Sequence, residues 1–166
     1  MRRLWILFVL SLVPTALAET PAGFVVYRPS DLKNEQAKLA QQAAQTKSAS
    51  VTLDRFAANH FSMLSYREAS GQAEIHEHMS DLFVVQDGEA TLVVGGEVPD
   101  AKPVSPGELR GSAIKGGTRT KLGPGDIVHI PPGLPQQLLV EDFGGFQVVT
   151  ERFLHDDSSP ALILLH

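Results

Sequence analysis

The most informative segment of this chain is Gly71-Gln-Ala-Glu-Ile-His-Glu-His-Met-Ser-Asp-Leu-Phe-Val-Val-Gln-Asp-Gly88. Side chains at alternate positions of an extended segment share one face, so Glu74, His76 and His78 are predicted to point the same way. Asp81 follows where an apolar run begins. Imidazole and carboxylate are ordinary ligands for divalent metals of the first transition row. The stretch therefore predicts a metal site on one face of a strand.

A second signature, Gly123-Pro-Gly-Asp-Ile-Val-His-Ile-Pro-Pro-Gly-Leu-Pro-Gln136, lies further along the chain. Together the two stretches resemble the cupin superfamily, whose motifs are written G-x5-H-x-H-x3,4-E-x6-G and G-x5-P-x-G-x2-H-x3-N. The second motif matches at Gly125, Pro131 and Gly133, but Gln136 stands in place of its histidine and Val140 in place of its asparagine. The resemblance runs from about Phe61 to Phe153.

In a metal-binding cupin the two motifs face each other across the barrel, and their side chains converge on one ion. The resemblance therefore implies that His76 and His78 are imidazole ligands, that Asp81 is the carboxylate ligand and that Gln136 takes the fourth position. The implied cofactor is one divalent ion, Mn, Fe, Ni or Zn. A second register is also open, since placing Glu74 and His76 at the two histidine positions restores the family spacing between His76 and Asp81.

Apolar periodicity predicts one helix and then many strands. Residues 30–46 favour a helix with Ser30 as N-cap and a narrow apolar stripe. From Val51 onward, short alternating or β-branched segments are separated by turn residues, which indicates strands. The strands are predicted at 51–56, 61–69, 73–78, 82–86, 89–94, 118–122, 127–130, 136–141 and 146–153.

Two segments that connect predicted strands contain residues typical of turns or loops. Asp87-Gly88 favours a tight hairpin turn, and Gly95-Gly96 would end that hairpin. Residues 97–117 are rich in proline and glycine, which predicts a long loop that serves as a lid or as a plain surface insertion. The predicted fold class is all-β, the cupin double-stranded β-helix or jelly-roll barrel, with an N-terminal helix.

The chain divides into four segments. Residues 1–18 carry a positive start, an apolar core and the pattern Ala16-Leu17-Ala18, which predicts a signal peptide and a periplasmic or secreted protein. An N-terminal extension with the helix follows at 19–50, the cupin barrel at 51–155 and a C-terminal tail at 156–166. The chain has no cysteine, so disulfides and thiol chemistry are excluded.

The net charge of the chain indicates which classes of binding partner to expect. Without Arg2 and Arg3 the chain keeps 12 basic and 19 acidic residues, a formal charge of −7. This balance argues against nucleic acid, and against a membrane after signal cleavage, as a partner. A small-molecule ligand is expected, and a homodimer built on the sheet edges is compatible with it.

Two functions remain open from the sequence. The first is a metal-dependent cupin enzyme, such as an oxygenase or an isomerase, in which His129 could supply a further imidazole or carry a proton. The second is a non-catalytic ligand-binding or sensing cupin that has lost its metal site, which the glutamine at position 136 favours.

Overall fold

The computed structural model describes residues 21–140 and 145–154, so the predicted signal peptide and the whole predicted C-terminal tail lie outside the described residues. This part of the chain contains one helix, α1 (Pro29–Thr46), and eleven strands. The strands are β1 (Ser48–Ala57), β2 (His60–Arg67), β3 (Ala73–His76), β4 (Met79–Asp87), β5 (Ala90–Val94), β6 (Lys102–Ser105), β7 (Glu108–Gly111), β8 (Thr118–Leu122), β9 (Ile127–Ile130), β10 (Gln136–Leu139) and β11 (Phe146–Leu154).

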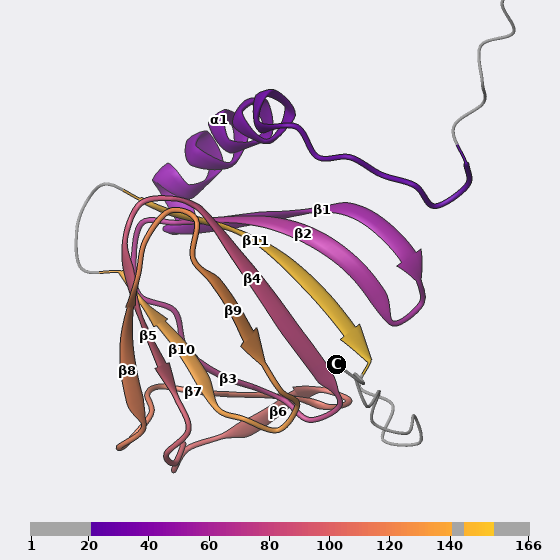
Figure 1. The fold of residues 1–166 in the computed structure, drawn as a ribbon. Helices are drawn as coiled ribbons and strands as arrows, with labels where there is room; N and C mark the ends of the chain where they lie inside the picture. Colours follow the sequence, from indigo (N-terminus) through magenta and orange to yellow (C-terminus); the bar gives the residue numbers. More distant parts are fainter. Residues whose placement is uncertain (1–20, 141–144, 155–166) are drawn as a thin grey trace, which may run out of the picture.

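The strands form two antiparallel sheets that face each other, as Figure 1 shows. The first sheet has the order β1-β2-β11-β4-β9 and the second the order β6-β7-β3-β10-β5-β8. Strands adjacent in the sequence often lie in different sheets, which is the pattern of a jelly roll. The predicted fold class is therefore confirmed.

The barrel core fills the space between the sheets. Every second residue of β4, β5 and β11 points inward, where Phe146 is fully buried and Val85 and Val148 are each 2% exposed. This apolar cluster occupies one part of the interior, and the polar side chains described below occupy the rest. The apolar part holds the two sheets together and fixes where the polar side chains lie.

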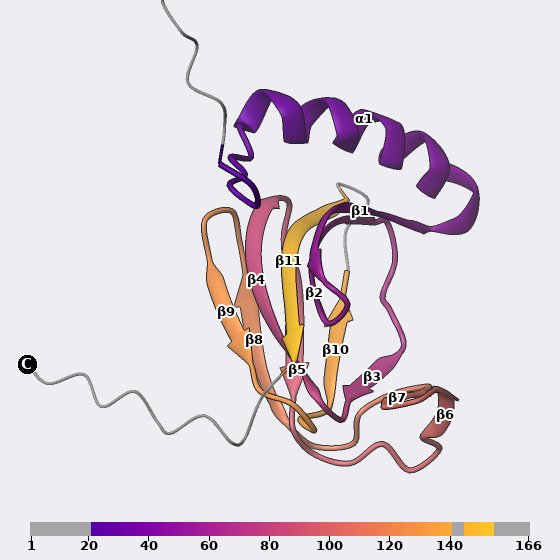
Figure 2. The same cartoon turned by 90° about the vertical axis from the view of Figure 1, so that its right-hand side faces the viewer.

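Helix α1 covers the outer face of the first sheet, above β1 and β2 (Figure 2). Its stripe of Leu32, Leu39 and Ala43 packs towards Leu64 and Val149, which point away from the barrel interior. The predicted range is confirmed, but the helix starts with Pro29 in its first turn and Arg28 as N-cap, rather than with Ser30 as N-cap. No helix in the described residues is long and apolar enough to span a membrane.

Two predicted connections are wrong. Asp87-Gly88 does form a turn, with Gly88 at φ +76°, but β4 and β5 belong to different sheets and do not pair as a hairpin. The turn carries the chain across the barrel, because pairing is decided by which sheet buries each strand and not by the turn residues alone. Residues 97–117, predicted as a long loop, contain β6 and β7, and β7 pairs with β3 at the end of the barrel away from α1 (Figures 1 and 2).

Candidate functional site

Strand β3 positions the first two polar side chains of the interior. Glu74 and His76 alternate along β3, and His76 is only 3% exposed. The strand ends at His76, whose carbonyl accepts a hydrogen bond from the Gly133 N–H at 2.8 Å, while the Glu77 N–H donates to the Gly107 carbonyl. The chain then turns towards the other sheet.

The prediction that His78 shares the face of Glu74 and His76 is therefore wrong. Glu77 and His78 form the bend between β3 and β4, and the exposed His78 ring lies against Gly107 instead of the interior. The bend exists because β3 and β4 belong to different sheets, so the alternation of an extended strand stops at His76. The interior histidine position is consistent with the second register, in which Glu74 and His76 occupy the motif's histidine positions.

Asp81 and Gln136 meet His76 in the interior. Asp81 is 1% exposed on β4, and Gln136 is 4% exposed at the start of β10. Gln136 Nε2 donates a hydrogen bond of 2.9 Å to Asp81 Oδ2, which lies 3.4 Å from His76 Nε2. Three of the four predicted ligands are thus brought together, and His78 is the one left outside.

Arg152 from β11 lies in the middle of this group. Its Nε donates to Asp81 Oδ1 at 2.6 Å, and its Nη2 lies 2.9 Å from Asp81 Oδ2 and 2.8 Å from His76 Nε2. A guanidinium can only donate, so Nε2 accepts, and the imidazole proton sits on Nδ1, which donates to Glu108 Oε2 at 2.6 Å. Both ring nitrogens of His76 are therefore engaged.

Asp81 keeps the guanidinium of Arg152 positively charged. Burial lowers the pKa of the Arg152 guanidinium, but the hydrogen bonds to Asp81 raise it by more, with further help from the charges of Glu108 and Glu74. Arg152 is therefore positively charged near neutral pH. The interior thus holds a cation between His76 and Asp81.

This architecture is similar to that of solved protein structures. No family model and no curated protein matches the sequence. Among solved structures, the chain is similar to the cupin domain of Cnp3 from Schizosaccharomyces pombe, with a TM-score of 0.51 and 9% sequence identity over 67% of each chain. The chain has a cupin fold.

Two further solved structures resemble it more loosely. A conserved protein with a double-stranded β-helix domain from Klebsiella pneumoniae has a TM-score of 0.49 at 16% identity, over 66% of this chain and 79% of that one. KdgF from Halomonas sp. has a TM-score of 0.48 at 13% identity, over 68% of this chain and 84% of that one. Likeness at such identities concerns the fold, and function has to be argued from the site.

The metal ion that the cupin resemblance implies does not fit the residues as they are arranged. A divalent ion bound by His76 Nε2 and Asp81 would need the position of Arg152 Nη2, which is hydrogen-bonded to both. Gln136 turns its amide N–H towards Asp81 and not its oxygen. Within residues 21–140 and 145–154, no group of three His, Asp or Glu side chains is arranged to hold a metal ion.

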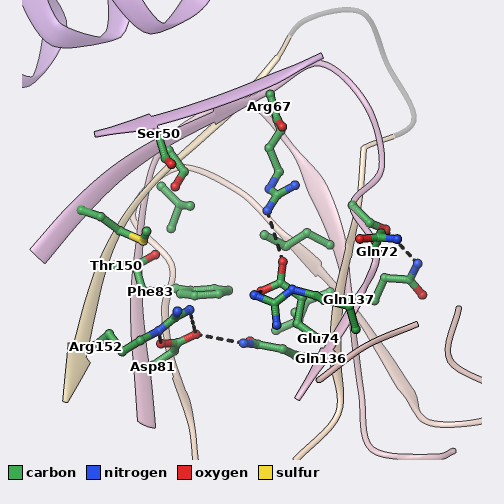
Figure 3. A pocket seen from close by; sticks show the side chains of 18 of the residues that line it. Ser50, Arg67, Gln72, Glu74, Asp81, Phe83, Gln136, Gln137, Thr150 and Arg152 are labelled. Carbon is green, nitrogen blue, oxygen red and sulfur yellow. Dashed lines mark hydrogen bonds and ion pairs between the residues drawn. The ribbon is translucent and has the colours of Figure 1, made fainter. Parts of the chain in front are cut away.

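Beside this cluster the barrel encloses a cavity of about 350 Å³. Its lining includes three arginines, Arg67, Arg110 and Arg152, and the carboxylates Glu74 and Asp81. Figure 3 shows Arg67 extending towards Glu74, while Gln136 and Arg152 meet at Asp81. The same figure labels five further residues of the cavity lining, Ser50, Gln72, Phe83, Gln137 and Thr150.

Two polar groups of the lining are incompletely satisfied. The closest partner of Arg67 among the described residues is Glu74, whose Oε1 lies 3.6 Å from Nη2, beyond hydrogen-bond distance. Gln136 Oε1 is buried and accepts no hydrogen bond from any described residue. Arg67 is therefore a charged donor on the cavity lining, and Gln136, another lining residue, has a buried acceptor with no donor among the described residues.

Glu74 remains ionised deep into the acid range. Burial raises the pKa of its carboxyl, but His76, Arg110 and Arg67 lower it by more, to about 2. His76 Nε2 lies 3.4 Å from Glu74 Oε2, and the Nη2 atoms of Arg67 and Arg110 each lie 3.6 Å from a Glu74 carboxylate oxygen. Glu74 is thus a carboxylate held by charge and a weak base.

This lowered pKa predicts acid sensitivity. Because the pKa is about 2 in the folded protein and 4.5 as the reference value, the stabilisation is complete above pH 4.5 and is lost as the pH falls towards 2. The loss should reach no more than about 3 kcal/mol. Urea unfolding between pH 5 and 2 should show a smaller fall in stability for Glu74→Gln than for wild type, and parallel curves would contradict the assignment.

The predicted candidate His129 lies outside the interior, whereas three residues that were not predicted, Arg152, Glu108 and Arg110, belong to the site. His129 is exposed on the outer face, where its ring stacks on Phe153 with centroids 6.5 Å apart, so it contributes nothing to the interior. Arg152 could have been found, because it continues the inward face of β11 that starts with Phe146. Glu108 and Arg110 had no comparable signal, since they lie in the segment predicted as a loop.

Proposed function

We propose that this chain is a ligand-binding cupin whose interior cavity takes a small hydroxylated organic anion without a metal ion. The observation that carries the proposal is the set of three guanidinium groups on the cavity lining. Arg152 is paired with Asp81 and Arg110 with Glu108. Arg67, in contrast, has Glu74 at 3.6 Å as its partner among the described residues and can still donate to an anion. An anion entering this space gains a favourable interaction that an uncharged molecule of equal size lacks.

The incompletely satisfied groups support the same ligand class. Arg67 can donate in a forked geometry to a carboxylate. The buried Gln136 Oε1 needs a donor, because an unpaired buried acceptor costs about 1–3 kcal/mol, and a ligand hydroxyl would supply one. The volume of about 350 Å³ lies within the usual range of small-molecule sites, roughly 300–1,000 Å³.

Binding is better supported than chemistry. Both ring nitrogens of His76 are engaged, and Asp81 accepts hydrogen bonds from Arg152 and Gln136. A Glu74 carboxyl with a pKa of about 2 is a poor general base near neutral pH. The metal-dependent oxygenase or isomerase implied by the resemblance has less support, because Arg152 lies where its ion would have to bind.

Isothermal titration calorimetry at low salt tests the proposal. The probes are the hydroxy acids glycerate, tartrate and gluconate, each paired with its uncharged counterpart, glycerol, threitol or sorbitol. At least one acid should bind at least about tenfold more tightly than its counterpart, a difference of about 1.4 kcal/mol. The preference should vanish in Arg67→Gln.

The matched control is Arg119→Gln, which removes an exposed arginine of β8 that is not part of the cavity lining. This variant should keep the preference of the wild type. Equal binding of acids and uncharged counterparts, or no binding of any probe, would contradict the proposal.

We also propose that the protein is exported and acts in the periplasm or outside the cell. The support is the arrangement of Arg2-Arg3, the apolar run and Ala16-Leu17-Ala18 in the sequence. Mass spectrometry of the protein expressed in full from its own first codon should find an N-terminus at Glu19. Soluble protein that retains Met1 would refute this part.

A further inference from the structure

A single guanidinium nitrogen lies at the centre of the polar cluster. Arg152 Nη2 is 2.8 Å from His76 Nε2 and 2.9 Å from Asp81 Oδ2. His76 Nε2 in turn lies 3.4 Å from Asp81 Oδ2 and 3.4 Å from Glu74 Oε2. One imidazole nitrogen and two carboxylate oxygens are thus gathered beside one positively charged group.

Two of the three separations among these atoms are compatible with a shared ion, but the guanidinium lies between them, so the three side chains form no metal site as they are arranged. Ligand atoms bound tetrahedrally at about 2.0–2.2 Å from an ion lie about 3.3–3.6 Å from one another. The two separations of 3.4 Å fall in this range. The bond from His76 Nδ1 to Glu108, at 2.6 Å, also matches the carboxylate contact that orients metal-bound histidines. The donors are suitable, and the guanidinium between them is what does not fit a metal ion.

We propose that Arg152 stands in for a divalent cation, and that His76, Asp81 and Glu74 bind a first-row divalent ion once the guanidinium is removed. The arginine supplies a fixed positive charge to a buried acidic pair, so these carboxylates need no ion. Its position on the inward face of β11 brings the charge to the barrel interior from a strand that neither sequence motif includes. This inference concerns the cation position and does not depend on which organic ligand the cavity takes.

The test is a gain of metal binding. Wild type, Arg152→Ala and Arg152→Met, expressed without a metal-affinity tag and freed of metal with chelator, are titrated with Zn²⁺ and with Mn²⁺. Both Arg152 variants should bind one Zn²⁺ or Mn²⁺ per chain at least about tenfold more tightly than wild type. The same ion should raise the unfolding midpoint of the variants and leave that of wild type unchanged.

Two controls locate the ion. Adding His76→Ala to Arg152→Ala should abolish the gained binding, whereas adding His78→Ala, which removes the exposed histidine, should leave it intact. Adding Gln136→His should tighten the binding further, because imidazole is a better donor than an amide oxygen.

Three results would overturn the inference. The first is wild type binding the ion as tightly as the Arg152 variants. The second is folded Arg152 variants that gain no binding. The third is variants that remain unfolded both with and without metal, because a latent site would restore folding when the ion binds. The hydroxy-acid titrations report on the cavity separately, so either proposal can fail while the other stands.

Discussion

Replacing Asp81 by alanine should lower the free energy of unfolding by about 3–5 kcal/mol. Asp81 is 1% exposed and accepts hydrogen bonds from Arg152 and Gln136. Alanine would leave a largely buried guanidinium without its carboxylate and the Gln136 amide N–H without its acceptor. A buried charge that loses its partner costs far more than the pair contributes when it is intact.

Urea unfolding followed by far-UV circular dichroism measures this loss, because the one tryptophan of the sequence, Trp5, lies within the predicted signal peptide. The informative control is the double variant Asp81→Val with Arg152→Met, which removes both charges. It should be more stable than Asp81→Ala alone. An Asp81→Ala protein within about 1 kcal/mol of wild type would show that the pair is not buried as described.

Replacing Phe146 by alanine should cost about 3–5 kcal/mol through a different mechanism. Phe146 is fully buried at the start of β11, in the apolar cluster between the two sheets. Its removal leaves a cavity that neighbours from both sheets cannot close without moving. The loss should appear in urea unfolding at neutral pH and should not depend on pH, since no charge is involved.

The control for Phe146→Ala is Ile127→Ala on the edge strand β9, where the isoleucine side chain is 67% exposed. It should change the free energy of unfolding by no more than about 0.5 kcal/mol. Similar losses for the two variants would contradict the division between the buried interior and the exposed edge.

The fold could be predicted from sequence because its signals are local. Alternating apolar residues and turn residues identify strands one at a time, and the helix has its own period. Strand partners are decided by contacts between distant segments, which explains the wrong hairpin at Asp87-Gly88. Strand β6 escaped prediction because it is exposed along its whole length and contains Pro103, so it has neither alternation nor a typical strand composition.

The candidate site was predictable in part for the same reason. His76, Asp81 and Gln136 come from the two motifs, and the structure brings them together. The chain turns at Glu77 and His78, since β3 ends at His76 and β4 begins at Met79, and this turn takes His78 off the face predicted for it. The motifs carry no information about Arg152, whose contacts with His76 and Asp81 span more than seventy residues of sequence.

A guanidinium, and not a metal ion, provides the positive charge beside His76 and Asp81. Elemental analysis by mass spectrometry of wild-type protein, purified without chelator and without a metal-affinity tag, should therefore find no first-row metal in stoichiometric amount. One Mn, Fe, Ni or Zn per chain, lost in His76→Ala and retained in His78→Ala, would contradict this assignment.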